Sequence, residues 1–511
     1  MTANDRDDSQ GIAHDSTVAV VGTGTMGQGI AQVALVAGHP VRLYDVAPGR
    51  ARTAADAIMA RLDRLVDKGR MPAEERDAAR ERLTPVGELA GLADAALVIE
   101  AILEELGAKQ QLFTALESVV SERCLLATNT SSLSVTAVAG ALRVPGRVVG
   151  LHFFNPAPLL PLVEVVSGFT TDAAAADLAY GTVAAWGKSP VRCTDTPGFI
   201  VNRVARPFYA EAFRVYEERA ADPATIDAVL RESGGFKMGP FELTDLIGQD
   251  VNEAVTRSVW ESFFHDPKFV PSLAQRRMVE AGLLGRKSGR GWYDYAEGAQ
   301  RPEPHTAEPA DPPASVVIRG TLEGSAAALP AMIEEAGIRV RRTDADRPAI
   351  HLPAGGRLCL ADGETSVEYN DVVYFDLALD YRSATRVAVS AAEDTPRALV
   401  DDAVGLFQAL GKKVSVIGDV PGMIVARTVA MLVDLAADAV AKGVASPEDV
   451  ETAMRLGVNY PQGPLAWGEQ VGHGTLFDLL TQLHKRFPTG RYAPSLGMIR
   501  RAYAAEDVVP S

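Results

Sequence analysis

The sequence has few cysteines and no long apolar run. Its three cysteines (Cys124, Cys193 and Cys359) cannot build a disulfide framework, and their spacing suits no metal site. We therefore expect a cytoplasmic protein without a metal. No apolar run reaches the ~20 residues of a membrane span without a charge, proline or glycine. The polar, acidic start of the chain also lacks the apolar segment of a signal peptide.

Positive charge is scarce as well. The 511 residues include 50 Lys and Arg against 66 Asp and Glu, which gives a net charge of −16. Sequence-independent binding of nucleic acid needs basic patches, so this composition argues against that class. A hydrophobic content of 47% is ordinary for a soluble globular protein. At ~100–200 residues per domain, the length predicts several domains, with neither a nucleic-acid nor a membrane partner.

The first half is expected to begin with a nucleotide-binding fold. Residues 17–46 have the pattern of a strand, a Gly-rich turn, a helix and a second strand, and later apolar runs predict further strands. Strands that alternate with helices predict a doubly wound, mostly parallel Rossmann-type sheet, so we expect an α/β domain over residues 16–196. From Pro197 the spacing becomes helical, which predicts an all-α domain over residues 197–295. Residues 1–15 are expected to be a disordered tail.

The architecture then starts again. Residues 296–314 are rich in Pro, Ala and Glu and predict a linker. The segments "SVVIRG" and "IRVRR", separated by a helical stretch, predict a second βαβ unit. We therefore expect a degenerate Rossmann-like domain over residues 315–418.

Two phrases repeat at a constant distance. "TPGFIVNR" begins at Thr196 and "VPGMIVAR" begins 224 residues later; the same offset relates Gly239–Pro240 to Gly463–Pro464. A gap-free offset over more than fifty residues indicates a duplicated helical domain, the second copy spanning residues 419–511. Asn202 is the position where the repeat changes its chemistry, because the second copy has Ala426.

A dinucleotide fingerprint follows the first strand. The segment "VVGTGTMGQG" carries a G-x-G-x-x-G pattern that opens a helix, and Asp45 ends the next strand. The glycines allow a tight turn, the approach of a pyrophosphate and close packing of helix on strand. Asp45 would accept from ribose hydroxyls and repel a 2′-phosphate, so NAD is favoured over NADP. The fingerprint residues expected to bind the cofactor are Gly22, Gly24, Thr25, Met26 and Gly27.

Polar residues follow or interrupt three later strands. Ser131 comes after one strand, His152 and Asn155 end another, and Glu164 lies within the apolar run "PLVEVVSG". A buried carboxylate needs a partner, and a histidine held by it can act as a general base. Taken singly, His152 could be a satisfied core histidine and Glu164 an exposed edge residue. Only the set, together with the nucleotide fingerprint, favours catalysis.

These motifs together resemble the short-chain L-3-hydroxyacyl-CoA dehydrogenases. The resemblance rests on "GTGTMGQGIA", "LVIEA", "NTSSL", "GLHFFNPAP", "LVEVVSG" and "DTPGFIVNR", which occur in this order within residues 16–295. It implies that His152 removes the proton of the 3-hydroxyl group and that Glu164 orients His152. It also implies that Ser131 and Asn202 bind the substrate oxygen, while the hydride leaves C3 for NAD. Residues implied near the cofactor are Glu100, Lys109, Asn155 and Lys287.

Over its whole length the chain is similar to the two-copy subgroup of aerobic phenylacetate catabolism, which acts on 3-hydroxyadipyl-CoA. That similarity implies an acyl-CoA substrate with a second carboxylate. Arg206 is a candidate to recognise the carboxylate. Lys68 is a candidate to bind CoA phosphates, but a solvated surface charge is the more ordinary role for such a lysine. Alternatives that remain open are a 3-hydroxybutyryl-CoA or general fatty-acyl dehydrogenase and a non-catalytic NAD-binding scaffold.

The second half is expected to be inactive. It has no G-x-G-x-x-G pattern, and an extended offset places Asp376 opposite His152 and Ala388 opposite Glu164. Proline, glycine and apolar positions are kept, as packing would require. We therefore predict an intrachain pseudo-dimer with one working site, and leave open whether chains associate further into a homo-oligomer.

Overall fold

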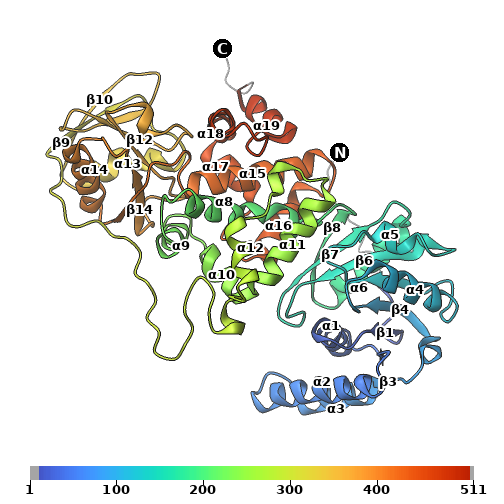
Figure 1. Cartoon of the computed structure of the whole chain (residues 1–511). Helices are drawn as coiled ribbons and strands as arrows, with labels where there is room; N and C mark the ends of the chain where they lie inside the picture. Colours follow the sequence, from blue (N-terminus) through green and yellow to red (C-terminus); the bar gives the residue numbers. More distant parts are fainter. Residues whose placement is uncertain (1–10, 507–511) are drawn as a thin grey trace. The chain divides into compact units, whose positions relative to one another are not determined.

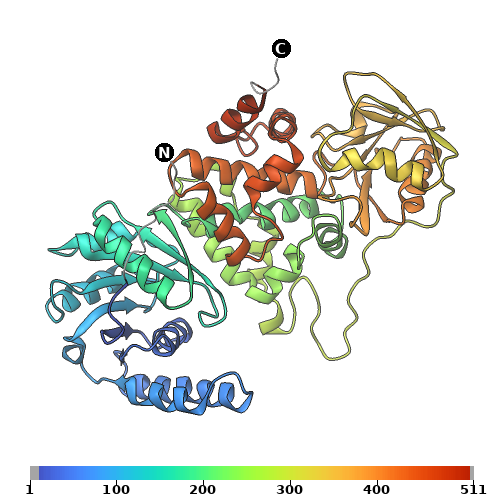
Figure 2. The same cartoon turned by 180° about the vertical axis from the view of Figure 1, so that it is seen from behind.

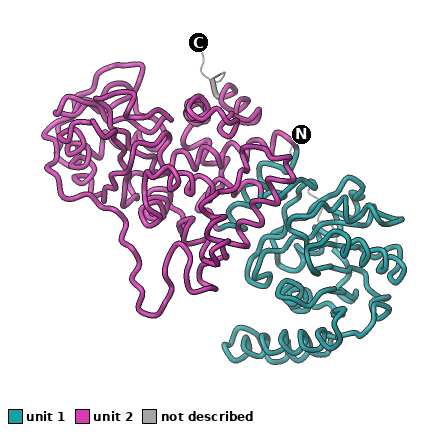
Figure 3. The backbone as a smooth tube through the Cα atoms, viewed as in Figure 1, with its two compact units in different colours: residues 1–202, 443–458 teal, residues 203–442, 459–511 magenta. Residues whose placement is uncertain are grey.

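The computed structural model describes residues 11–506, which divide into two compact units. Unit 1 contains residues 1–202 and 443–458, and unit 2 contains residues 203–442 and 459–511 (Figure 3). The first ten residues of the predicted tail lie outside the described residues. Within the described part of that tail, the Ile12 N–H donates to the hydroxyl of Thr182 at 3.1 Å.

Unit 1 is built on an eight-stranded sheet (Figure 1). Its strand order is β3-β2-β1-β4-β5-β6-β7-β8, and only the β6–β7 pair is antiparallel. The doubly wound, mostly parallel sheet is therefore confirmed. The strands are β1 (Thr17–Val21), β2 (Val41–Tyr44), β3 (Leu83–Pro85), β4 (Ala95–Glu100), β5 (Leu125–Thr128), β6 (Val148–Phe153), β7 (Leu162–Ser167) and β8 (Ser189–Thr194).

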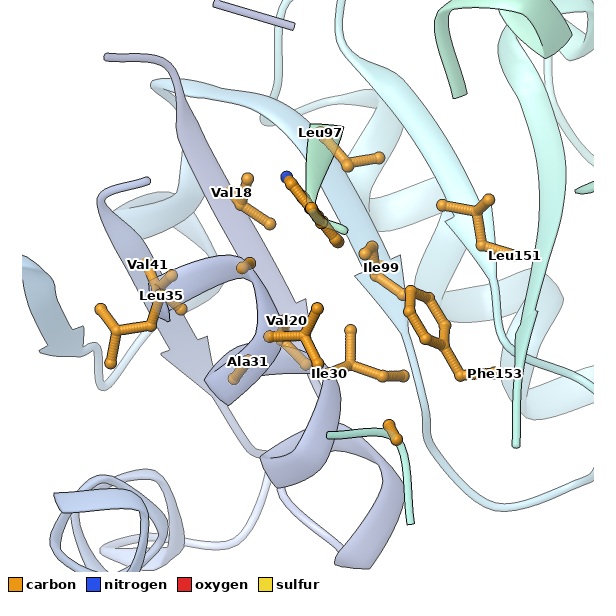
Figure 4. Packing of buried hydrophobic residues seen from close by; sticks show 14 of the residues in the cluster. Val18, Val20, Ile30, Ala31, Leu35, Val41, Leu97, Ile99, Leu151 and Phe153 are labelled. Atoms are coloured by element: carbon orange, nitrogen blue, oxygen red, sulfur yellow. The ribbon is translucent and has the colours of Figure 1, made fainter. Parts of the chain in front are cut away.

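Helices cover this sheet and close its core. In Figure 4, Ile30 and Ala31 of α1 lie near Val20 of β1, Leu35 of α1 lies beside Val41 of β2, and all five are buried. Each such side chain contributes roughly 1.5–3 kcal/mol when it leaves water, somewhat less for alanine. The helices of this part are α1 (Thr25–Val36), α2 (Arg50–Asp67), α3 (Ala73–Arg82), α4 (Leu106–Glu117), α5 (Val135–Ala139) and α6 (Ala173–Ala185), with 3₁₀ turns η1 (Leu89–Leu92) and η2 (Pro145–Arg147).

Unit 2 holds helices from both copies and the second sheet. The helices of the first copy are α8 (Arg206–Glu217), α9 (Pro223–Glu232), α10 (Pro240–Ile247), α11 (Gln249–Ser262) and α12 (Leu273–Glu280), with η3 (Pro267–Phe269) and η4 (Arg286–Ser288). Those of the second copy in this unit are α15 (Val425–Ala441), α17 (Pro464–Val471), α18 (His473–Arg486) and α19 (Leu496–Glu506). Helices α8 and α15 pack on each other, so the two helical domains meet inside unit 2.

The second sheet has seven strands in the order β10-β9-β11-β12-β13-β14-β15. Strand β11 runs antiparallel to both neighbours, and β13 runs antiparallel to β14. Its elements are β9 (Ser315–Arg319), β10 (Arg339–Thr343), β11 (Ala349–His351), β12 (Arg357–Leu360), β13 (Val372–Phe375), β14 (Arg386–Ser390), β15 (Lys413–Ile417), α13 (Leu329–Glu335), α14 (Arg397–Ala409), η5 (Gly324–Ala328) and η6 (Ser366–Glu368). Residues 299–313, which precede this sheet, form neither helix nor strand and run as a long connection (Figures 1 and 2).

The two copies exchange one helix. Helix α16 (Pro447–Gly457) comes from the second copy but packs on β7 and β8 of the first sheet, whereas α9 of the first copy packs on β14 of the second sheet (Figure 1). Both helices begin with a capping side chain and a proline: Asp222 accepts from Thr225 N, and Ser446, 224 residues later, accepts from Asp449 N. The exchange explains why residues 443–458 belong to unit 1.

One helix prediction is wrong. The segment "FIVNRVARPFYAEAFRVYEE" within the predicted all-α domain has helical spacing throughout, which predicts a single helix carrying Asn202 and Arg206. The structure instead has a short helix, α7 (Val201–Val204), and then α8, which begins at Arg206 with a proline at its second position. Proline has no N–H to donate and fits the first turn of a helix, so it favours a new start here. Among the described residues, no helix is long and apolar enough to cross a membrane.

Candidate active site

The turn between β1 and α1 is shaped for a dinucleotide. Gly22 has a φ of +94°, and a Cβ there would lie 2.5 Å from Ala101 O; a Cβ on Gly27 would lie 1.8 Å from Gly22 O. A Cβ on Gly24 would meet no atom within 4 Å. Gly22 and Gly27 thus serve the turn itself, while Gly24 leaves open space in front of the N-terminus of α1, which starts at Thr25 and Met26. Free N–H groups and the helix dipole favour a pyrophosphate there, so these residues fit NAD.

Asp45 is held at the end of β2 beside this turn. Its Oδ2 accepts from Thr23 N at 3.0 Å and from Thr23 Oγ1 at 2.6 Å, and its Oδ1 accepts from Ala47 N at 3.0 Å. Burial raises the pKa of Asp45, but these hydrogen bonds outweigh burial and the net pKa is lowered. A fixed negative charge at this place suits ribose hydroxyls and disfavours a 2′-phosphate.

Glu100 and Lys109 form a buried ion pair at the end of β4. Lys109 Nζ lies 2.5 Å from Glu100 Oε1, and Glu100 also accepts from Ile102 N and Thr128 Oγ1. Both side chains are at most 1% exposed. The structure thus brings these two predicted residues together, and the pair anchors the loop that follows β4.

Glu104 is a residue of this region that the sequence patterns did not single out. Lys109 Nζ lies 3.1 Å from its Oε2, while its Oε1 accepts from Ser131 N at 2.9 Å and from Ser132 N and Ser132 Oγ at 3.1 and 3.0 Å. Burial raises the pKa of Glu104, but the charge of Lys109 and these hydrogen bonds lower it overall. Glu104 therefore fixes the loop after β5 and engages the hydroxyl of Ser132 rather than that of Ser131.

His152 and Glu164 face each other across β6 and β7. They are direct register partners, and His152 Nδ1 lies 2.6 Å from Glu164 Oε2. His152 is 6% exposed and Glu164 is fully buried. A carboxylate at Nδ1 makes that nitrogen the donor, which leaves Nε2 as the proton acceptor.

The other oxygen of Glu164 holds the start of the next helix. Glu164 Oε1 accepts from Ile200 N at 3.0 Å and from Val201 N at 2.9 Å. These residues directly precede Asn202 on α7. One buried carboxylate therefore positions both the base and the turn that carries the predicted substrate-binding amide.

Lys68 and Asn155 share a pocket with the start of α1. The pocket holds about 360 Å³, and its lining includes Thr25, Lys68 and Asn155. Its further basic residues are Arg61, Arg64 and Arg70. An anionic ligand is therefore favoured at this place.

Two predicted site residues belong to unit 2. Arg206 is buried, donates to Thr256 Oγ1 at 3.2 Å and lies with its guanidinium 5.1 Å from the ring centre of Tyr209. Lys287 pairs with Asp250 at 2.5 Å. Their roles in binding substrate and cofactor stay predictions.

The Gly-rich turn, Asp45 and the buried His–Glu pair fit the class of NAD-dependent dehydrogenases. Comparison with known proteins narrows this class. A family model described as "3-hydroxyacyl-CoA dehydrogenase, NAD binding domain" matches residues 17–196. The C-terminal domain of the same family matches residues 198–295 and again 422–506, and a "3-hydroxybutyryl-CoA dehydrogenase reduced Rossmann-fold domain" matches residues 358–421.

One relative and one solved structure match nearly the whole chain, and a shorter relative matches about half of it. The 3-hydroxyadipyl-CoA dehydrogenase of Escherichia coli (strain K12) is 45% identical over 491 residues, which are 95% of this chain and 97% of the relative. A crystal structure described as 3-hydroxybutyryl-CoA dehydrogenase from E. coli K12 is similar with a TM-score of 0.88 and 43% identity, covering 97% of this chain and all of that one. A 3-hydroxybutyryl-CoA dehydrogenase of Mycobacterium tuberculosis (strain H37Rv) is 41% identical over 280 residues, 54% of this chain and 98% of the relative. The chain belongs to the 3-hydroxyacyl-CoA dehydrogenase family, and its second half is a degenerate repeat of the first.

Proposed function

We propose that this protein oxidises (3S)-3-hydroxyadipyl-CoA to the 3-oxoacyl-CoA at a single site in its first half. The observation that carries the proposal is the buried contact of His152 with Glu164, whose second oxygen holds the turn before Asn202. Removal of a hydroxyl proton requires a base with a fixed orientation. Glu164 fixes the His152 ring through Nδ1, in the same sheet domain as the dinucleotide turn.

In this proposal His152 Nε2 takes the proton of the 3-hydroxyl group. Glu164 stabilises the imidazolium that forms and keeps the ring from turning. The Ser131 hydroxyl and the Asn202 amide hold the substrate oxygen in line with the base. When NAD is bound, its nicotinamide accepts the hydride from C3.

The basic pocket beside α1 supports a CoA substrate. Lys68 and the arginines that line it with Asn155 supply several positive charges close to the nucleotide turn. Phosphate groups bind well to such clusters, so we propose that Lys68 meets a CoA phosphate.

The whole-length relative in E. coli supports the dicarboxylic substrate, because its name specifies 3-hydroxyadipyl-CoA. A second candidate is 3-hydroxybutyryl-CoA, which is favoured by the description of the similar E. coli structure. A role in phenylacetate catabolism follows only from the first candidate.

Steady-state NADH formation with both acyl-CoAs tests the proposal. We expect a kcat/KM at least about tenfold higher for 3-hydroxyadipyl-CoA, a difference of about 1.4 kcal/mol in transition-state binding. A higher value for the C4 substrate would reject the dicarboxylic substrate but keep the reaction. His152→Gln should lower kcat about 10²–10⁴-fold with unchanged NAD affinity; unchanged turnover would reject the mechanism.

A further inference from the structure

The second sheet domain contains a cavity of about 790 Å³, within the size range of small-molecule sites. Side chains on one face of this sheet form the apolar core with α13 and α14, among them Ile318, Ile350, Leu358 and Val373. The alternate residues of the same strands point to the opposite face and line the cavity. These are Arg319, Ala349, His351, Arg357, Cys359 and Tyr374.

Strand register places the cavity's cations side by side. His351 of β11 pairs directly with Arg357 of β12, and Ala349 pairs directly with Arg319 of β9. The side chain of Arg319 is exposed. Burial lowers the pKa of His351, and the charges of Arg319 and Arg357 lower it further, so the three groups lie within electrostatic reach.

The charges of this cluster are incompletely neutralised. Arg357 lies 3.5 Å from the exposed carboxylate of Asp371, and its buried Nε has no hydrogen-bond partner among the described residues. Arg347, on another wall, is already paired with Asp362 and Glu364 at 3.0 Å each. An anion would thus bind to Arg319 and Arg357 rather than to Arg347.

Much of the remaining lining is apolar or aromatic, and its polar members are Thr321, Ser325, Thr475 and the carboxylates Glu323 and Asp346. Leu322, Ala326, Leu377 and Val471 contribute carbon surface, and Tyr369 lies with its ring centre 5.3 Å from the Arg357 guanidinium. Leu377 lies 224 residues after Phe153, so the cavity reaches the strand end at which the first sheet carries its histidine. The Gly-rich turn is lost here, because "RGTLEG" follows β9 and places Glu323 in the lining. A pyrophosphate bound at this turn would be repelled by the Glu323 carboxylate.

We propose that the second sheet domain retains a ligand site of its own, for a small organic anion with a single phosphate or carboxylate group on an aromatic or apolar body. Arg319 and Arg357 bind the anionic group, and the body lies against Tyr369 and the apolar wall. The site takes no dinucleotide and performs no chemistry. It makes the second half a binding module in addition to a packing partner.

Isothermal titration of the full chain tests this site. NAD and free coenzyme A are kept saturating so that the first half is occupied. The probes are phenyl phosphate and benzoate, which separate a phosphate from a carboxylate ligand, with benzyl alcohol as the neutral counterpart. We expect at least one anion to bind once per chain, and benzyl alcohol to bind at least about tenfold more weakly.

Two variants locate the binding. Arg319→Glu should weaken the anion at least about tenfold, because it places a like charge in the cavity. Arg339→Glu is the matched control: it reverses an exposed arginine on neighbouring β10, outside the cavity lining, and should leave binding unchanged. Circular dichroism and thermal unfolding check that both variants fold, and Arg357→Gln replaces Arg319→Glu if the latter does not. Absence of binding by both anions, equal binding of the neutral probe, or unchanged binding in the folded cavity variant would overturn the proposal.

Discussion

The start of the repeated helix is held by a different carboxylate in each of the two copies. In the first copy His152 faces Glu164 across the strands, and Glu164 accepts from Ile200 and Val201. In the second copy Asp376 stands at the position of the histidine, opposite Ala388, and Asp376 N donates to Ala388 O at 2.9 Å. The extended offset of 224 is therefore also correct in the strands.

Asp376, at the position of His152, holds the helix start of the second copy as Glu164 holds that of the first. Its carboxylate accepts from Ile424 N at 3.0 Å, Val425 N at 2.8 Å and Ala426 N at 3.0 Å. The first two donors are the counterparts of Ile200 and Val201. The Asp376 carboxylate accepts directly from the N–H groups at the helix start. Because Asp376 occupies the position of the histidine, the second copy has no imidazole there. A carboxylate thus holds the helix start in both copies, whereas only the first copy has a histidine beside it.

The largest effect should separate these two carboxylates. In Glu164→Gln the amide would donate to His152 Nδ1, which forces the proton onto Nε2 and removes the base; we expect kcat to fall about 10³–10⁴-fold. Asp376→Asn should leave kcat unchanged and lower the free energy of unfolding by about 1–3 kcal/mol. Steady-state kinetics and urea unfolding of both variants check this. A comparable loss of kcat in Asp376→Asn would show that the second copy takes part in catalysis.

The next effect concerns the equivalent arginines of the repeated phrase. Arg427 is fully buried and pairs with Glu211 and Glu218 of the first copy, while Arg203 pairs with Asp438 of the second. Arg427→Met should cost about 3–5 kcal/mol of stability, because it removes one of the two arginines that pair with the fully buried Glu211. Arg203→Met should cost less, since Asp438 is partly exposed and keeps Lys442 at 2.9 Å. Urea unfolding measures both; a larger loss for Arg203→Met would contradict this ranking.

Low pH should weaken the ion pairs of Glu211 with Arg427 and Arg491. Burial raises the pKa of Glu211, but Arg491 and Arg427 outweigh it and lower the pKa from 4.5 to about 2. The unfolded state binds the proton more readily than the folded state. The contribution of Glu211 to the free energy of unfolding is therefore fully present above pH 4.5 and is lost as the pH falls from 4.5 toward 2. The full effect is about 3 kcal/mol. Urea unfolding at pH 5 and pH 3 should show this loss for the native chain and a flatter dependence for Glu211→Gln; equal slopes would exclude Glu211 as the cause.

The smallest effect concerns the turn that only the first copy has. Gly24→Ala places a methyl group in open space, so the melting temperature should stay the same. The KM for NAD should rise about tenfold, since the methyl group occupies space near the pyrophosphate. Gly27→Ala is the contrasting variant, because its Cβ would collide with Gly22 O and should lower the melting temperature. A loss of stability in Gly24→Ala would show that this glycine serves the fold rather than the ligand.

Local patterns predicted much of this fold and site. The strand–turn–helix with Asp45 and the register partners His152 and Glu164 depend on residues near in sequence or on alternation along a strand. The role of Glu104 depends on how the loop after β4 folds toward Ser132, which no periodicity encodes. The hydrophobic pattern also could not predict the exchange of α9 and α16, because any amphipathic helix of this length could cover either sheet. Proline at the second position of α8 was a usable signal for the break after Val204.

We expect this duplicated chain to have one working nucleotide site. Equilibrium dialysis of radiolabelled NAD against the full chain tests it most directly, with Gly24→Ala as a variant that weakens the first site. We predict one NAD bound per chain, and the affinity of that NAD falls in the variant. Two NAD per chain, or one that is unaffected by the variant, would contradict the account.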